Sequence, residues 1–144
     1  MSRTQRTATA LMVAYLLLVA WIVFWPSAGP ASASVTWMSG VLRVLGAPAW
    51  VSGAVVEFLA NVAMFVPLSF LGSLVIQDWD WPRWLLVGFV ASGVIELGQL
   101  AVLPDRSATL VDVVANTLGA LLGAVLLLPL REHFLRRDAR SLGA

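Results

Sequence analysis

Residues 95–123, IELGQLAVLPDRSATLVDVVANTLGALLG, decide the fold of this chain. Two apolar runs meet here at a short polar connection that contains Arg106. Polar side chains also stand inside the runs themselves: Glu96, Gln99, Asp112 and Asn116. Ionisable groups inside apolar runs of membrane length are costly, so they mark a functional site by default. The stretch therefore predicts two adjacent membrane helices that share one polar cluster.

The composition of the whole chain is that of a membrane protein. Its 144 residues are 60% hydrophobic and 12% charged, whereas soluble domains carry about 25% charged residues. The net charge of +1 gives no indication of a nucleic-acid partner. Because there are no cysteines and the single His133 lies in a basic tail, we expect no disulfide, no metal site and no cofactor.

Four apolar runs are long enough to cross a bilayer, at approximately 8–25, 55–76, 84–103 and 110–130. At about 1.5 Å per residue, each reaches or nearly reaches the roughly 30 Å of the hydrocarbon core. Residues 35–45 have helical spacing but are too short to span, which predicts an amphipathic helix in the interface. Residues 27–34 are rich in Ala, Ser, Gly and Pro and predict a loop. We expect an all-α membrane protein, a single domain over 1–144 with four transmembrane helices and one interfacial helix.

The first run has a second interpretation, as a secretory signal peptide. Arg3 and Arg6 would form its basic start, and residues 31–33 resemble a small-residue cleavage site. The run is longer than a typical signal core, and Trp21 and Trp25 suit a membrane interface. We favour an uncleaved first span, and the signal-peptide alternative stays open.

The arginines predict the orientation in the membrane. With four spans both termini share one side, and that side carries Arg3, Arg6, Arg83 and the four arginines of residues 131–144. The opposite side carries Arg43 and Arg106. Because basic residues accumulate on the cytoplasmic side, we expect a multi-pass protein of the bacterial inner membrane with both termini in the cytoplasm.

Under this orientation, polar residues of three spans reach one level near the outer boundary. They are Glu57 and Asn61 in the second span, Glu96 and Gln99 in the third, and Asp112 and Asn116 in the fourth. Spacings of three or four residues put each pair on one helix face, within roughly 10 Å of that boundary. Gly119 and Gly123 continue the face of the fourth span at a spacing that permits close helix approach. The pattern predicts a compact bundle with an outward-opening polar notch, in which Glu57 has a solvated or interfacial role.

The cost of a carboxylate in lipid, at least about 2.5–3.5 kcal/mol, limits what the acids of the notch do. Glu96 is either a ligand-contacting or proton-handling group, or a structural group paired with Arg106. Arg106 and Asp112 form either a structural ion pair or part of a site in which Arg106 grips a phosphate or carboxylate. Hydrogen bonds between helices are the expected role of Asn61, Gln99 and Asn116.

These residues, in this order and spacing, resemble the VanZ-like family of small bacterial membrane proteins. The resemblance covers roughly 58–130 and rests on Asn61-x3-Phe65-x-Pro67, Ile95-Glu96-x2-Gln99 and Arg106-x5-Asp112-x3-Asn116-x2-Gly119-x3-Gly123. Ser69 departs from the glycine that the family usually has after the Pro67-Leu68 pair. The family is named for a protein linked to low-level resistance to teicoplanin, a lipoglycopeptide, and no reaction is firmly assigned to it. The resemblance places the motif on Asn61, Glu96, Gln99, Arg106, Asp112 and Asn116.

Three functions compete on this basis. The favoured one is a non-enzymatic protein whose notch binds a membrane lipid or envelope amphiphile, such as a cell-wall lipid intermediate or a lipoglycopeptide. The alternative is an intramembrane enzyme acting on a lipid phosphate, with Glu96 and Asp112 as acid and base and Arg106 stabilising charge. A channel or transporter is third, because the polar groups occupy only the outer half of the spans. Whether the chain forms a homo-oligomer stays open.

Overall fold

A computed structural model describes residues 1–25, 29–102 and 109–142. The described residues are helical, without strands, and form α1 (Arg3–Val23), α2 (Gly29–Val44), α3 (Gly53–Val75), α4 (Trp81–Val102) and α5 (Leu110–Leu142). Helices α1, α3, α4 and the Leu110–Leu130 part of α5 are long and apolar enough to cross a membrane. The predicted all-α membrane architecture with four spans is confirmed.

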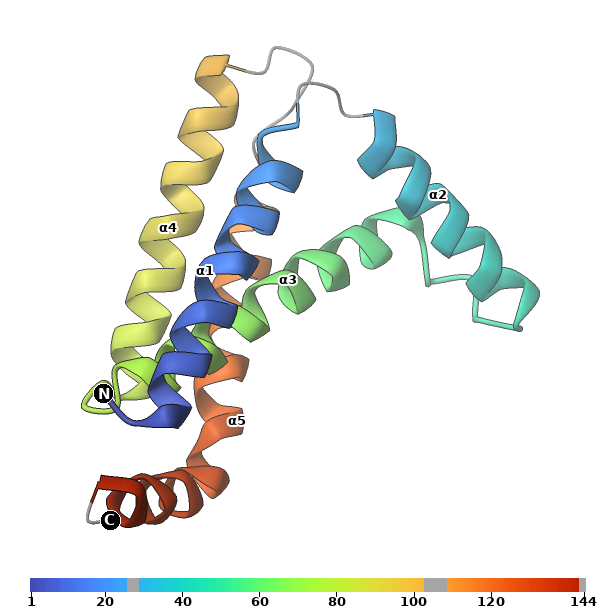
Figure 1. The fold of residues 1–144 in the computed structure, drawn as a ribbon. Coiled ribbons are helices and arrows are strands. Elements are labelled where there is room, and N and C mark those ends of the chain that lie inside the picture. Colours follow the sequence, from blue (N-terminus) through green and yellow to red (C-terminus); the bar gives the residue numbers. More distant parts are fainter. Residues whose placement is uncertain (26–28, 103–108, 143–144) are drawn as a thin grey trace.

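Helix α5 is central to the bundle. It packs most extensively against α3 and next against α4, while α3 and α4 touch each other little. Helix α1 packs mainly against α3, and α2 packs against α3 at the side of the bundle, from which it projects away (Figure 1). Both termini lie toward the same end of the bundle (Figure 1), as four membrane crossings require.

Small residues allow α5 to approach its two neighbours closely. A Cβ added at Gly119 would collide with the backbone carbonyl of Val62 in α3, and one at Gly123 with the carbonyl of Val66. On the other side of α5, a Cβ at Gly88 of α4 would collide with the side chain of Ala120. Membrane helices associate largely through such close packing, because lipid supplies no hydrophobic force between them. The close approach predicted for Gly119 and Gly123 is confirmed.

Helix α1 is tied to the rest of the bundle by polar side chains. The Gln5 amide donates to the carbonyl of Val75 at 3.4 Å, and the Tyr15 hydroxyl donates to the carbonyl of Met64 at 3.1 Å. Met64 lies in the turn before Pro67, the proline inside α3. These contacts fit an integral first span, and cleavage of a signal peptide is untested by them.

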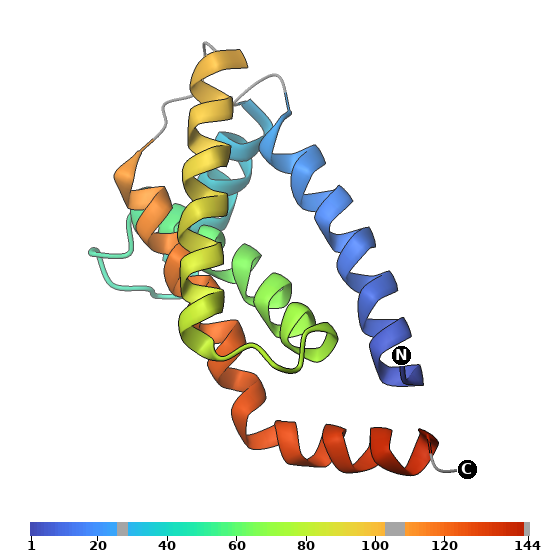
Figure 2. The same ribbon diagram turned by 90° about the vertical axis from the view of Figure 1, so that its left-hand side faces the viewer.

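Two helices extend beyond the expected ranges. Helix α2 begins at Gly29, so the loop expected over 27–34 is wrong from residue 29 onward. Pro30 falls in the first turn, where its missing N–H has no intrahelical partner to lose. The fourth span, 110–130, is as expected, and helix α5 continues beyond it to Leu142, with its C-terminal part turned across the end of the bundle (Figures 1 and 2). Pro129 lies inside the helix, where a missing donor favours a bend.

Candidate functional site

Thr109 organises the point where α5 begins. Its carbonyl accepts from the backbone N–H of Val113 at 3.4 Å, which is the first turn of the helix. Its hydroxyl accepts from the backbone N–H of Asp112 at 3.1 Å and donates to Oδ2 of the same residue at 2.7 Å. This is the geometry of a helix N-cap. The Asp112 carboxylate also lies in the first turn, where the helix dipole favours negative charge.

Glu96 of α4 completes this cap from another helix. In a capping box, the side chain three residues into the helix accepts the N–H of the cap residue. Here Glu96 Oε2 accepts the backbone N–H of Thr109 at 3.1 Å. The carboxylate of Glu96 is 8% exposed, although it lies in a membrane span. The start of α5 is therefore fastened to α4 by a buried acid.

Asn61 brings α3 into the same group. Its side-chain amide donates to Oδ1 of Asp112 at 2.6 Å. Both carboxylate oxygens of Asp112 thus accept hydrogen bonds, one from α3 and one from Thr109. We call Asn61, Glu96, Thr109 and Asp112 the polar cluster. Asn61 and Asp112 are half-buried, so this cluster reaches the surface of the bundle.

Asn116 lies one turn further along α5 and is part of the interior. Its side-chain amide donates to the Ser92 hydroxyl of α4 at 2.8 Å. Ser92 is fully buried and Asn116 is 3% exposed. The pair joins α4 to α5 without reaching the surface. The structure therefore places Asn116 in helix packing, next to the cluster but apart from its hydrogen bonds.

Gln99 and Glu57 do not join the cluster. The Gln99 amide donates to the carbonyl of Val23 at 2.9 Å, which satisfies one of the last carbonyls of α1. Gln99 lies one helical turn from Glu96 on α4, but its side chain serves the contact with α1. Glu57 is exposed on α3, as expected of a solvated acid.

Two residues remain to be compared with the prediction: Arg106, which was predicted, and Thr109, which was not. Arg106 lies outside the described residues, so its place above the cluster stays a prediction. Thr109 was not among the predicted site residues, because it falls in the connection between two apolar runs. A signal was present: Thr109 and Asp112 have the Thr-x-x-acid spacing of a helix cap immediately before an apolar run.

The polar cluster contains two carboxylates, of which Glu96 is buried and Asp112 is half-buried. The hydrogen bonds that these acids accept from Asn61 and Thr109 come from neutral donors. Within the described residues no group of three or more His, Cys, Asp or Glu is placed to hold a metal ion. The arrangement suits hydrogen bonding and charge complementarity with a polar group that arrives from the membrane surface.

A comparison with models of known protein families gives one match that covers most of the chain. The model described as VanZ/LLP1 matches residues 12–132, from α1 into the C-terminal part of α5, and so includes every residue of the polar cluster. The match begins well before residue 58, where the resemblance in the sequence starts. No curated protein and no solved structure matches the chain. Because the match covers most of its length, the chain belongs to the VanZ/LLP1 family.

Proposed function

We propose that this protein is a non-enzymatic membrane protein that binds the headgroup of a lipid or cell-envelope amphiphile at the polar cluster. The observation that carries the proposal is the convergence of α3, α4 and α5 on the two acids. Asn61 and Thr109 hold Asp112 from both sides, and Glu96 is buried beside them. Groups so costly in a membrane are usually functional.

Burial separates the binding part of the site from its support. Asn61 and Asp112 are half-buried and can meet a ligand, whereas the Asn116–Ser92 pair is sealed inside the helix contact. The pair is well suited to fix the spacing of α4 and α5 below the cluster. A ligand then meets a preorganised surface and loses little affinity to ordering it.

The surroundings of the cluster suit an amphiphile. Leu97 and Leu100 on α4 and Leu110 and Val111 on α5 are exposed, with exposed fractions from 59% to 84%. An acyl chain would pack along these faces while the headgroup meets the acids. Hydroxyl, amide or amine groups of the headgroup would donate to the carboxylates. Arg106, if it lies above the cluster as the sequence predicts, would take a phosphate or carboxylate.

This chemistry fits a cell-wall lipid intermediate or a lipoglycopeptide such as teicoplanin. Both combine a long hydrocarbon chain with a polar headgroup that carries hydrogen-bond donors. With the termini in the cytoplasm, as the arginine distribution predicts, the cluster would open toward the outer face of the inner membrane. Binding there would alter susceptibility to agents that act on the envelope.

The test compares two acids of the same chain. Glu96→Gln changes the buried acid, and Glu57→Gln changes an exposed acid in the α3 span, which serves as the matched control. Purified variants in nanodiscs are titrated with a fluorescent teicoplanin and with a polyprenyl-pyrophosphate lipid. We expect Glu96→Gln to weaken binding about tenfold, as loss of a charge-assisted hydrogen bond does, and Glu57→Gln to leave it unchanged.

Two results would count against the proposal. Equal affinity of wild type, Glu96→Gln and Asp112→Asn for both ligands would remove the cluster from binding. Turnover of the polyprenyl-pyrophosphate by wild type, abolished in Asp112→Asn, would establish the enzymatic alternative instead. The same variants, expressed in cells, report whether teicoplanin susceptibility follows binding.

A further inference from the structure

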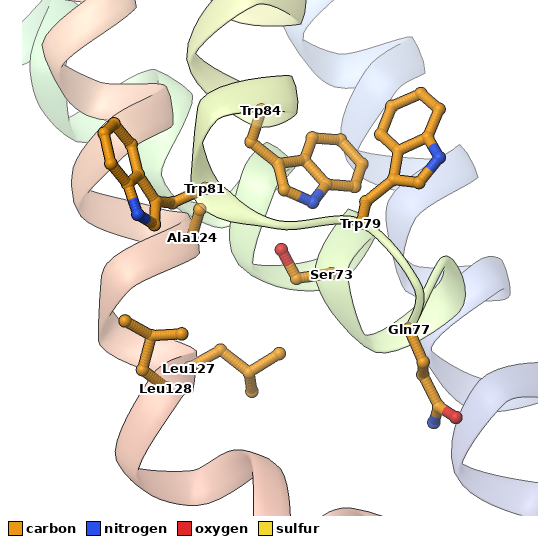
Figure 3. A pocket seen from close by; sticks show the side chains of 8 residues that line it. All are labelled: Ser73, Gln77, Trp79, Trp81, Trp84, Ala124, Leu127 and Leu128. Atoms are coloured by element: carbon orange, nitrogen blue, oxygen red, sulfur yellow. The ribbon is translucent and has the colours of Figure 1, made fainter.

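A second polar feature lies near the opposite end of the bundle, away from the cluster. A cavity of about 20 Å³ lies between the end of α3, the start of α4 and the last part of the α5 span. Figure 3 shows its lining, with Ser73 from α3, Trp81 and Trp84 from α4, and Leu127 and Leu128 from α5. A space of this size holds one oxygen atom with its hydrogens.

Trp84 supplies a donor to this cavity. Trp84 is 7% exposed. Its six-membered ring packs so closely against Gly72 that a Cβ at Gly72 would collide with the ring. The ring also contacts Trp79, with centroids 5.1 Å apart. The indole nitrogen is buried and has no hydrogen-bond partner among the described residues. In Figure 3 that nitrogen is on the side of the ring facing Ser73. A buried indole N–H without a hydrogen-bond partner costs free energy. We therefore expect a bound group in the cavity to accept this hydrogen bond.

Ser73 supplies the complementary acceptor. Its hydroxyl donates to the carbonyl of Ser69 at 2.7 Å, which uses its only proton. The oxygen keeps lone pairs that can accept. A group placed between Trp84 and Ser73 must therefore accept one hydrogen bond and donate another. A hydroxyl does both, whereas a carbonyl or an ammonium does only one.

We propose that this cavity binds one hydroxyl group from the headgroup of an anionic phospholipid with a glycerol headgroup. The cavity borders the lipid-facing surface, because Trp81 and Leu128, which line it, are 45% and 47% exposed. Tryptophans gather at the headgroup level of membranes. Only the hydroxyl enters the cavity, and the acyl chains pack outside along α5.

The charge at this end of the bundle fits an anionic lipid. Of the described charges at this end, Arg3, Arg6 and Arg83 outnumber Asp78 and Asp80. The side chain of Arg83, in the first turn of α4, is 57% exposed, and its Nε lies 3.7 Å from Asp80 Oδ1. Arg3 and Arg6, near the N-terminus, are exposed as well. Basic residues at a membrane surface attract anionic headgroups. A water molecule offers the same hydroxyl chemistry without this charge preference, so the test must separate the two sources.

The test follows the indole N–H signals of the full chain by NMR with ¹⁵N-labelled tryptophan. The protein is placed in nanodiscs of phosphatidylcholine alone, which has no headgroup hydroxyl, or of an equal mixture with phosphatidylglycerol. The signal of Trp84 is identified by its loss in Trp84→Phe, which keeps an aromatic ring and removes the N–H. The 70% exposed Trp50 is the control signal.

We expect phosphatidylglycerol to shift the Trp84 signal, with cross-relaxation from the glycerol protons, and to leave Trp50 unchanged. Ser73→Ala, which removes the acceptor together with the bond to the Ser69 carbonyl and leaves the indole N–H in place, should weaken this effect, and the preference for phosphatidylglycerol should fall about tenfold. A Trp84 signal that is identical in both nanodiscs and contacts only water would overturn the lipid assignment. So would an undiminished shift in Ser73→Ala.

Discussion

Replacing Thr109 with Val removes one hydroxyl and keeps the shape of the side chain. The hydroxyl donates to Asp112 Oδ2 at 2.7 Å and accepts the backbone N–H of the same residue at 3.1 Å. The backbone N–H of Thr109 still reaches Glu96, so that bond survives the change. The substitution therefore isolates the cap and the support of Asp112 from the contact with α4.

Two terms give the magnitude. Loss of a helix N-cap costs about 0.5–2 kcal/mol in water-soluble proteins. The bond to Asp112 is charge-assisted, worth about 1.5–3 kcal/mol in soluble proteins, whereas polar contacts between membrane helices average about 0.6 kcal/mol. Because the two bonds share one hydroxyl, their costs do not add. We expect Thr109→Val to lower the free energy of unfolding by about 1–2 kcal/mol.

The measurement is reversible unfolding in mixed detergent micelles, followed by circular dichroism. Thr109→Ser is the matched control, because Ser keeps the hydroxyl and is as good an N-cap as Thr; it should stay within about 0.5 kcal/mol of the wild type. If Thr109→Val is as stable as Thr109→Ser, the hydroxyl does not cap α5 and the description of the cluster is wrong. Asn61→Leu, which removes the other bond to Asp112, should couple to Thr109→Val in a double-mutant cycle.

Three further predictions concern the packing of the helices and the first span. Gly123→Ala should destabilise the protein by about 1–3 kcal/mol in the same unfolding assay, because the added Cβ would collide with the Val66 carbonyl. Gly93→Ala is the control: it has open space around it and should be neutral or slightly stabilising. Equal effects of the two substitutions would refute the close crossing of α3 and α5. Gln99→Leu should cost about 0.6 kcal/mol through its lost bond to α1, and a gain in stability would contradict that role. The intact mass of protein purified from membranes should include α1, whereas a product that starts after residue 33 would establish the signal peptide.

The spans were predictable because membrane insertion depends on a local property. Apolar runs of about 20 residues identify four helices whatever they pack against. The helix ends were less predictable, since α1 and α4 start in polar or aromatic residues outside the apolar runs, at Arg3 and Trp81. Hydropathy therefore does not indicate where these first helical turns begin. For α1, the cap formed by Ser2 and Gln5 is the visible signal.

The close contact of α3 and α5 was also predictable, at least from one side. Gly119 and Gly123 at a four-residue spacing identify a face of α5 that admits a neighbour. Their partner was not identifiable, because Val62 and Val66 contribute backbone carbonyls, and every residue has one. Only the packed structure shows which helix occupies the face.

The sequence by itself determined the relative level of the polar residues along the spans. Helix rise is constant, so the position of a residue in a span sets its level, and Asn61, Glu96 and Asp112 do meet at one level. The tertiary structure alone decided which side chains bond. Each helix can rotate about its axis and choose its neighbour, and the packing of small residues sets both. For that reason Gln99, one helical turn from Glu96, turned out to serve α1, while Thr109, from a short connection, links the two acids.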